Sequence, residues 1–161
     1  MNTNISALIT SRCTLNCAYC SSGIPYHKKR EDIPAEQLVE RIGQILALYS
    51  AAEINVEHLD LVGGEPLLHS ELPGIVEGVC RWRDVFHELR ILTNGTIVPE
   101  DALLDTILRQ EIPFLMIVSD YGVLSPRSVE VSRRVEDHGL RCRVDRYHDS
   151  GQYFGGWVSY G

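Results

Sequence analysis

The chain has 161 residues, 44% of them hydrophobic and 23% charged, which is ordinary for one globular domain that buries a core. Its formal net charge of −7 argues against nucleic acid as a main partner, because phosphate binding needs a basic face. No apolar run approaches the roughly 20 residues that span a bilayer, and the N-terminus has no secretion signal, so we expect a cytoplasmic protein that does not contact membranes.

Short apolar runs alternate along the chain with segments of helical periodicity, which predicts repeated βα units and a parallel sheet. The predicted strands are 5–10, 58–62, 88–92, 114–118 and 140–146, and the predicted helices are 34–49, 72–83, 100–110 and 125–138. Asp32 is the expected N-cap of the first helix, and Gly139 is expected to end the last one. We interpret residues 1–161 as a single domain, with βα units over 1–147 and an irregular tail or sixth strand over 148–161.

Three cysteines follow the first predicted strand in a C-x3-C-x2-C arrangement, at Cys13, Cys17 and Cys20. Thiolates are the usual protein ligands of iron–sulfur clusters, and three of them leave one iron of a cubane without a protein ligand. An open coordination site on a metal centre is where chemistry takes place. On spacing alone, a zinc site with His27 as a fourth ligand and a disulfide are alternatives. The odd total of five cysteines favours a reducing compartment over a disulfide scaffold.

A glycine pair, Gly63 and Gly64, ends the second predicted strand and is followed by Glu65 and Pro66. Two glycines at the carboxyl end of a strand let a ligand approach the backbone closely, because no Cβ lies in the way. Taken alone, this Gly-Gly-Glu-Pro segment is equally consistent with an ordinary strand-to-helix turn.

Together, the cysteine motif, with Tyr19 before its last cysteine, and the Gly-Gly-Glu-Pro segment resemble the radical S-adenosylmethionine (radical SAM) superfamily. The resemblance implies an α/β fold, a partial (βα)6-type barrel with a parallel sheet. Five strands and four helices are predicted here, so the last units of the barrel are expected to be incomplete. It also implies a [4Fe–4S] cluster on Cys13, Cys17 and Cys20, with S-adenosylmethionine as the second cofactor.

The resemblance further implies contacts between this cofactor and the strand ends. The residues expected to bind it are Tyr19, Gly63, Gly64, Glu65, Asn94, Ser119 and Arg143. In this interpretation the strand-end backbone and the Glu65 carboxylate face the amino group of the cofactor. Two of the assignments have simpler alternatives: Asn94 is followed by Gly95, as in many turns, and Arg143 has Asp145 as a neighbour on the same face of its strand.

The activity implied by the resemblance is reductive cleavage of S-adenosylmethionine to a 5′-deoxyadenosyl radical, which abstracts hydrogen from a small-molecule or peptide substrate. An electron donor such as flavodoxin or ferredoxin would be a partner. The sequence identifies neither the substrate nor any residue that acts on it, because function depends on the site and not on the fold. The alternative is a non-catalytic iron–sulfur or cofactor-binding module, or a truncated subunit completed by another chain.

Two expectations concern the limits of the site. Cys80 and Cys142 fall in the apolar patterns of their elements, so we expect buried core thiols there and not ligands of a second cluster. A Gly64→Val substitution is expected to weaken cofactor binding but to spare the cluster, because the cysteines belong to a different loop.

Overall fold

The computed structural model describes residues 2–18 and 20–147. Five strands form one sheet in the order β1-β2-β3-β4-β5, and each neighbouring pair is parallel. The strands are β1 (Asn2–Thr10), β2 (Asn55–Gly63), β3 (Phe86–Thr93), β4 (Phe114–Asp120) and β5 (Cys142–Arg146), and the α-helices are α1 (Ala35–Ala51), α2 (Leu72–Val79), α3 (Asp101–Arg109) and α4 (Ser128–Asp137). The predicted α/β architecture with a parallel sheet is confirmed.

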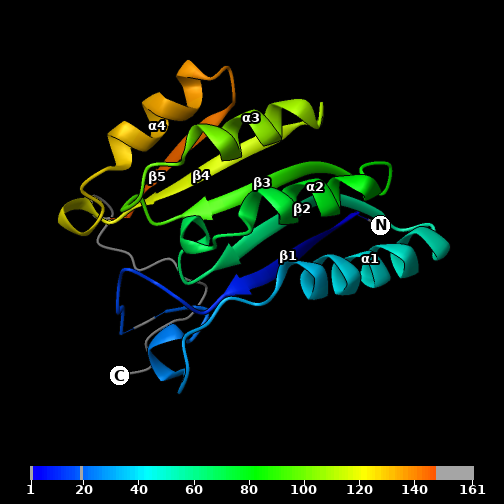
Figure 1. Ribbon diagram of the computed structural model, residues 1–161, viewed down its shortest axis with the longest axis horizontal. Helices are drawn as coiled ribbons and strands as arrows, with labels where there is room; N and C mark the ends of the chain where they lie inside the picture. Colours follow the sequence, from blue (N-terminus) through cyan, green and yellow to red (C-terminus); the bar gives the residue numbers. More distant parts are fainter. Residues whose placement is uncertain (1, 19, 148–161) are drawn as a thin grey trace.

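The four α-helices lie along one face of the sheet (Figure 1). Strand side chains alternate between the two faces, and those on the helix side are apolar and buried. They include Ile9, Leu59, Leu61, Leu89, Ile91, Met116 and Val118, all fully shielded from solvent. The opposite face carries polar and charged side chains over much of its length, such as Asp60, Arg90 and Arg143. Among the described residues, the main core therefore lies between the sheet and the helices.

The helix ends show why two local predictions had different outcomes. Helix α1 begins at Ala35 with Pro34 at the N-cap position, so the prediction that Asp32 caps it is wrong: the Asp32 side chain is bonded to Thr10 and Arg12 instead. Gly139 has a φ of 78°, and the N–H groups of residues 139 and 140 donate back to the last turn of α4. Its predicted role in ending that helix is confirmed.

The carboxyl ends of the strands meet at one edge of the sheet, on the left in Figure 1, together with the loop between β1 and α1. This is the edge at which active sites of parallel βα folds collect. Sequential strand order places the ends of β1, β2 and β3 side by side. Two predictions, the role of Tyr19 and the conformation of the 148–161 tail, lie outside the described residues.

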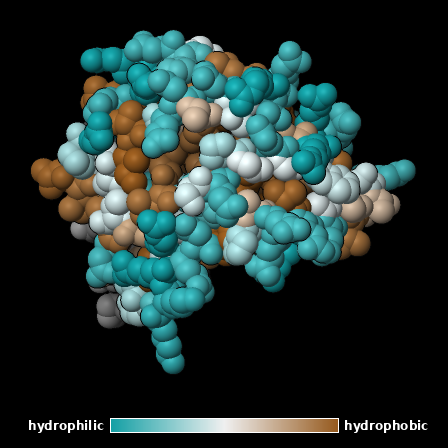
Figure 2. Space-filling model, in the orientation of Figure 1, coloured by the Kyte–Doolittle hydropathy of each residue, from teal (hydrophilic) through white to brown (hydrophobic). Residues whose placement is uncertain are grey.

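The helix-bearing face is largely hydrophilic, with hydrophobic side chains visible in patches between polar ones (Figure 2). This pattern fits helices that direct one apolar stripe into the core. Within the part of the chain that the structure describes, no helix combines the length and the apolar character needed to span a bilayer.

Candidate functional site

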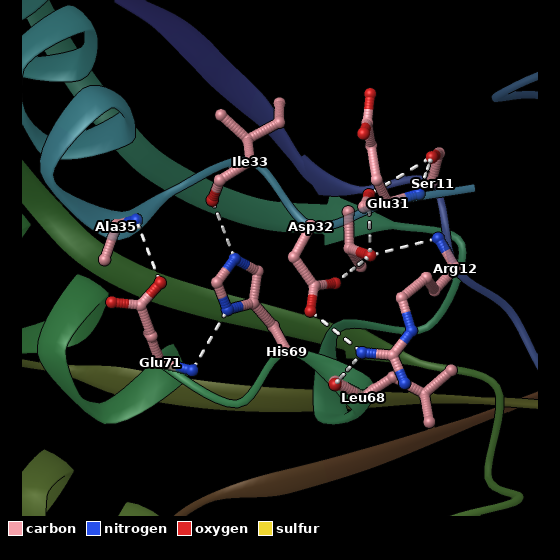
Figure 3. Close-up of polar contacts among 10 residues, drawn as sticks. Ser11, Arg12, Glu31, Asp32, Ile33, Ala35, Leu68, His69 and Glu71 are labelled. Carbon is pink, nitrogen blue, oxygen red and sulfur yellow. Dashed lines mark hydrogen bonds and ion pairs between the residues drawn. The ribbon is translucent and has the colours of Figure 1, made fainter. Parts of the chain in front are cut away.

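The cysteine loop leaves the end of β1 and is closed at its base by backbone hydrogen bonds. The Ser11 N–H donates to the Glu31 carbonyl at 3.0 Å, and the Ile33 N–H donates to the Ile9 carbonyl at 3.1 Å. The Ser11 hydroxyl accepts from the Glu31 N–H at 2.8 Å (Figure 3). Residues 12–30 therefore form a loop whose two ends are held together, which reduces the entropy cost of ordering its cysteines.

Asp32 strengthens the base of this loop. Its carboxylate accepts from the Thr10 hydroxyl at 2.6 Å and from Nη1 of Arg12 at 2.9 Å. Figure 3 shows Arg12 reaching across to Asp32 and to the Leu68 carbonyl, 3.2 Å away. Burial raises the pKa of Asp32, but the hydrogen bonds from Thr10 and Arg12 outweigh it and leave the pKa below its usual value.

A buried histidine fastens the next segment to the same base. His69 is 3% exposed, and its Nδ1 accepts from the Glu71 N–H at 3.1 Å. A backbone N–H can only donate, so the ring proton lies on Nε2, which donates to the Ile33 carbonyl at 2.8 Å. Because both ring nitrogens are engaged, His69 holds the segment after β2 against the segment before α1 (Figure 3).

The three loop cysteines are free thiols of intermediate exposure, so the disulfide alternative is not supported. Burial raises the pKa of both Cys13 and Cys17. Among the described residues, no three His, Cys, Asp or Glu side chains lie close enough together to hold one metal ion. His27, the fourth ligand considered for a zinc site, is exposed. Three thiols on one closed loop do fit the donor set of an iron–sulfur cluster, one for each of three irons.

The glycine pair at the end of β2 packs directly against the start of this loop. The Gly64 N–H donates to the Thr10 carbonyl at 2.9 Å, and the Glu65 N–H donates to the Arg12 carbonyl at 2.8 Å. A Cβ on Gly64 would lie 2.1 Å from the Arg12 carbonyl oxygen and 2.8 Å from Cβ of Cys13. The premise that the cysteine loop is separate from Gly64 is therefore wrong, because the two motifs are in contact, and we now expect Gly64→Val to disturb the loop as well.

Glu65 is fully buried, and both oxygens of its carboxylate are already engaged. Oε1 accepts from the Leu67 N–H at 3.0 Å, and Oε2 accepts from the Asn94 N–H at 2.8 Å. Burial raises the pKa of Glu65, while these N–H groups and the Thr93 hydroxyl favour its charged form. The carboxylate thus joins the end of β2 to the end of β3, and a cofactor contact at Glu65 would come from its backbone.

Asn94, the residue after β3, also points into the cysteine loop. Its Nδ2 lies 3.0 Å from Oγ1 of Thr14 and 3.6 Å from Sγ of Cys13. The structure thus brings Asn94 together with the predicted ligand loop and with Glu65. Its predicted contact with S-adenosylmethionine stays a prediction.

Ser119 and Arg143 lie on the neighbouring strands β4 and β5. Ser119 is in register with Asp145, and the Arg143 guanidinium donates twice to the Asp145 carboxylate, at 2.9 Å each. The structure therefore groups these two predicted cofactor contacts at the far side of the strand edge, with Arg143 ion-paired and half exposed. Asp145 is thus the partner anticipated as the simpler alternative for Arg143.

Two contributors to this edge were not predicted. Ser125 is 2% exposed, and its hydroxyl donates to the Asn94 carbonyl at 2.6 Å while accepting from the Tyr121 N–H at 2.9 Å. Tyr121 stacks on Tyr147 with ring centroids 5.3 Å apart, which places an aromatic pair at the ends of β4 and β5. A serine before a proline gives no local signal of such a role, whereas tyrosines directly after two strands could have been noted.

The fold and the site are those expected of a radical SAM protein, and comparison with known proteins agrees with this class. The Radical SAM superfamily profile matches residues 7–117, and the chain belongs to this superfamily. A probable GTP 3′,8-cyclase of Archaeoglobus fulgidus is 35% identical over 101 residues, which is 62% of this chain and 30% of that protein. A GTP 3′,8-cyclase of Acidothermus cellulolyticus is 34% identical over 96 residues, covering 58% of this chain and 26% of that protein.

Solved structures of radical SAM proteins share the fold. Streptococcus suis SuiB bound to S-adenosylmethionine has a TM-score of 0.67 at 15% identity, over 89% of this chain and 33% of SuiB. HydG, a maturase of the [FeFe]-hydrogenase, has a TM-score of 0.59 at 12% identity, over 91% of this chain and 35% of HydG. The chain spans about 30% of the length of the curated relatives it matches. A [4Fe–4S] cluster and S-adenosylmethionine, the two cofactors expected from the sequence, are those of the superfamily to which the chain belongs.

Proposed function

We propose that this chain is the cofactor-binding core of a radical SAM enzyme, with the cluster held by the three loop cysteines. The observation that carries the proposal is the direct bonding between the cysteine loop and the Gly-Gly-Glu segment. Two backbone N–H groups, those of Gly64 and Glu65, donate to the Thr10 and Arg12 carbonyls. The start of the ligand loop, next to Cys13, and the glycine pair are therefore fixed relative to each other before any ligand binds, which is the preorganisation that a shared cofactor needs.

When bound, the cluster and S-adenosylmethionine would supply the chemistry, which is reductive cleavage of the cofactor to a 5′-deoxyadenosyl radical able to abstract hydrogen from a substrate. The residues of this chain would bind and orient the two cofactors. We assign the amino group of the cofactor to the backbone of Gly63, Gly64 and Glu65. We assign the hydroxyl or carboxylate groups of the cofactor to Ser119 and Arg143. The electron would come from a donor such as flavodoxin or ferredoxin in a reducing, cytoplasmic setting.

The substrate we propose is a small molecule or a peptide. The sequence relatives act on GTP by name, and SuiB has been solved with its precursor peptide SuiA, in a structure that this chain matches with a TM-score of 0.65 at 15% identity. The sequence relatives support a small molecule more directly, since the likeness to SuiB is one of fold. Each match covers a third or less of the other protein, so neither match identifies the particular substrate of this chain.

Anaerobic reconstitution with iron and sulfide, followed by dithionite and S-adenosylmethionine, tests the proposal without a known substrate. We expect a brown protein that releases 5′-deoxyadenosine, detected by mass spectrometry, and a Cys17→Ala variant that releases none. A protein that holds the cluster and binds S-adenosylmethionine but yields no 5′-deoxyadenosine would be the non-catalytic module instead. A protein that binds neither would overturn the proposal.

A further inference from the structure

Asn94 is held from several sides at the end of β3. Its N–H donates to Oε2 of Glu65 at 2.8 Å, and its carbonyl accepts from the Ser125 hydroxyl at 2.6 Å. The residue is 8% exposed. The buried side chains of Glu65 and Ser125 therefore hold the Asn94 backbone in place, and this fixed backbone sets the direction of the Asn94 side chain.

The hydrogen bonds around the Asn94 amide settle which end is oxygen and which is nitrogen. One end lies 3.1 Å from the Thr96 backbone nitrogen, and a backbone N–H can only donate, so that end is the accepting Oδ1. The Thr96 hydroxyl, 2.7 Å away, donates to the same oxygen. The other end is therefore Nδ2, which carries two hydrogens and points into the cysteine loop.

Both hydrogens of Nδ2 have acceptors in that loop. One goes to Oγ1 of Thr14 at 3.0 Å, and Thr14 in turn lies 2.7 Å from the Thr96 hydroxyl. Because the Thr96 hydrogen is used on Asn94, the Thr14 hydrogen is the one shared between the two threonines, and the three side chains form a closed ring of hydrogen bonds. The second hydrogen of Nδ2 is left for Sγ of Cys13, at 3.6 Å.

We propose that Asn94 is a positioning residue for Cys13. Through an N–H···S hydrogen bond from its side chain to the Cys13 sulfur, Asn94 sets the reduction potential of the cluster. The inference rests on the proposed function, in which Cys13 is a cluster ligand. Hydrogen bonds to cluster sulfurs tune the potential, because they stabilise the more negative, reduced cluster more than the oxidised one. The Leu15 N–H, 3.4 Å from the same sulfur, gives Cys13 a second donor from the backbone.

The test is the midpoint potential of the reconstituted cluster, followed by electron paramagnetic resonance, in Asn94→Ala and Thr14→Val. Asn94→Ala removes the N–H donor to Cys13 without adding a charge. At a fixed applied potential we expect its ratio of reduced to oxidised cluster to fall by about tenfold, which is about 59 mV for a one-electron couple. Thr14→Val removes the other acceptor of Nδ2 and leaves the N–H···S bond, so its shift should be much smaller.

Iron content and circular dichroism decide the outcomes. A folded Asn94→Ala protein with full iron and a lowered potential, beside a Thr14→Val protein whose potential stays close to the wild-type value, would support the inference. A folded Asn94→Ala protein that holds no iron, full iron with an unchanged potential in Asn94→Ala, or equal shifts in both variants would overturn it. If the wild-type protein itself assembles no cluster, the proposed function fails; if the wild type assembles a cluster and cleaves S-adenosylmethionine, only the role of Asn94 is at stake.

Discussion

The cysteines of this chain occupy two contrasting regions. Cys13, Cys17 and Cys20 share one closed loop at the carboxyl edge of the sheet, where each thiol has intermediate exposure. Cys80 lies at the end of α2, 4% exposed, and burial raises its pKa to about 11. Cys142, at the start of β5, is partly buried against the core, and burial raises its pKa as well. The expected core role is confirmed for Cys80, and Cys142 packs beside that core without being fully buried.

The comparison of core and loop cysteines shows which features identify a thiol as a candidate cluster ligand. A cysteine inside a helix or strand belongs to a packed layer and has no other thiol next to it in the chain, so it behaves as a small apolar side chain. The loop thiols are presented together, and the sulfur of Cys13 receives N–H donors from Leu15 and Asn94. Grouping and directed donors distinguish the two regions better than burial does.

The largest expected effect comes from removing one loop thiol. Cys17→Ala leaves two thiols for the cluster, so we expect reconstituted iron content and brown colour to fall close to the level of protein without cluster. Iron and sulfide analysis after desalting is the measurement, with Cys142→Ala as the matched control that should retain full iron. Full iron content in Cys17→Ala would contradict the assignment of the loop cysteines, as opposed to the core cysteines, as cluster ligands.

The next effect tests the contact between the two motifs. In Gly64→Val the new side chain meets the Arg12 carbonyl and Cys13, and overpacking of this kind costs about 1–3 kcal/mol or more. We therefore expect iron content and S-adenosylmethionine binding to fall together. Gly74→Val is the matched control, because a Cβ on Gly74 meets nothing within 4 Å.

Iron analysis and calorimetric titration of S-adenosylmethionine separate the outcomes of this substitution. Loss of both in a protein with wild-type circular dichroism supports the coupling of loop and glycine pair. A Gly64→Val protein with full iron and weakened cofactor binding would show instead that the motifs act independently.

These contacts also mark the limit of what the sequence predicts. The strands and helices follow from short-range periodicity, because alternate strand residues face the helix layer and bury apolar side chains. The loop cysteines follow from their spacing. The Gly64–Arg12 contact, and the bond from Asn94 to Glu65 and Thr14, link residues of different βα units, 29 and 80 positions apart in the last two cases. Local pattern does not encode which polar group a folded sheet will bring to such a residue.

A smaller effect concerns the base of the cysteine loop and its dependence on pH. Asp32→Ala removes the acceptor of Thr10 and Arg12, so we expect the free energy of unfolding of the metal-free protein to fall by about 1–3 kcal/mol at pH 7. The folded-state pKa of Asp32 is lowered from 3.8. Its contribution is therefore present above pH 3.8 and is lost as the pH falls through the folded-state value.

Urea unfolding at pH 7 and at pH 3 measures this difference. The gap between wild type and Asp32→Ala should shrink at the lower pH, while Asp105→Ala, at an exposed position on α3, controls for the loss of one negative charge. An equal gap at both values of pH would show that the carboxylate charge does not hold the loop base.

The smallest effect is expected in the core region. Cys80→Ala removes one sulfur from a packed site, so the free energy of unfolding should fall by about 1 kcal/mol while iron content stays at the wild-type level. Cys80→Ser should cost more than Cys80→Ala although it is closer in size, because it buries a hydroxyl in place of a weakly polar thiol. Denaturant unfolding of both variants beside iron analysis is the measurement. If Cys80→Ala lowered iron as far as Cys17→Ala does, Cys80 would belong to the ligand set, and burial would have been the wrong guide to its role.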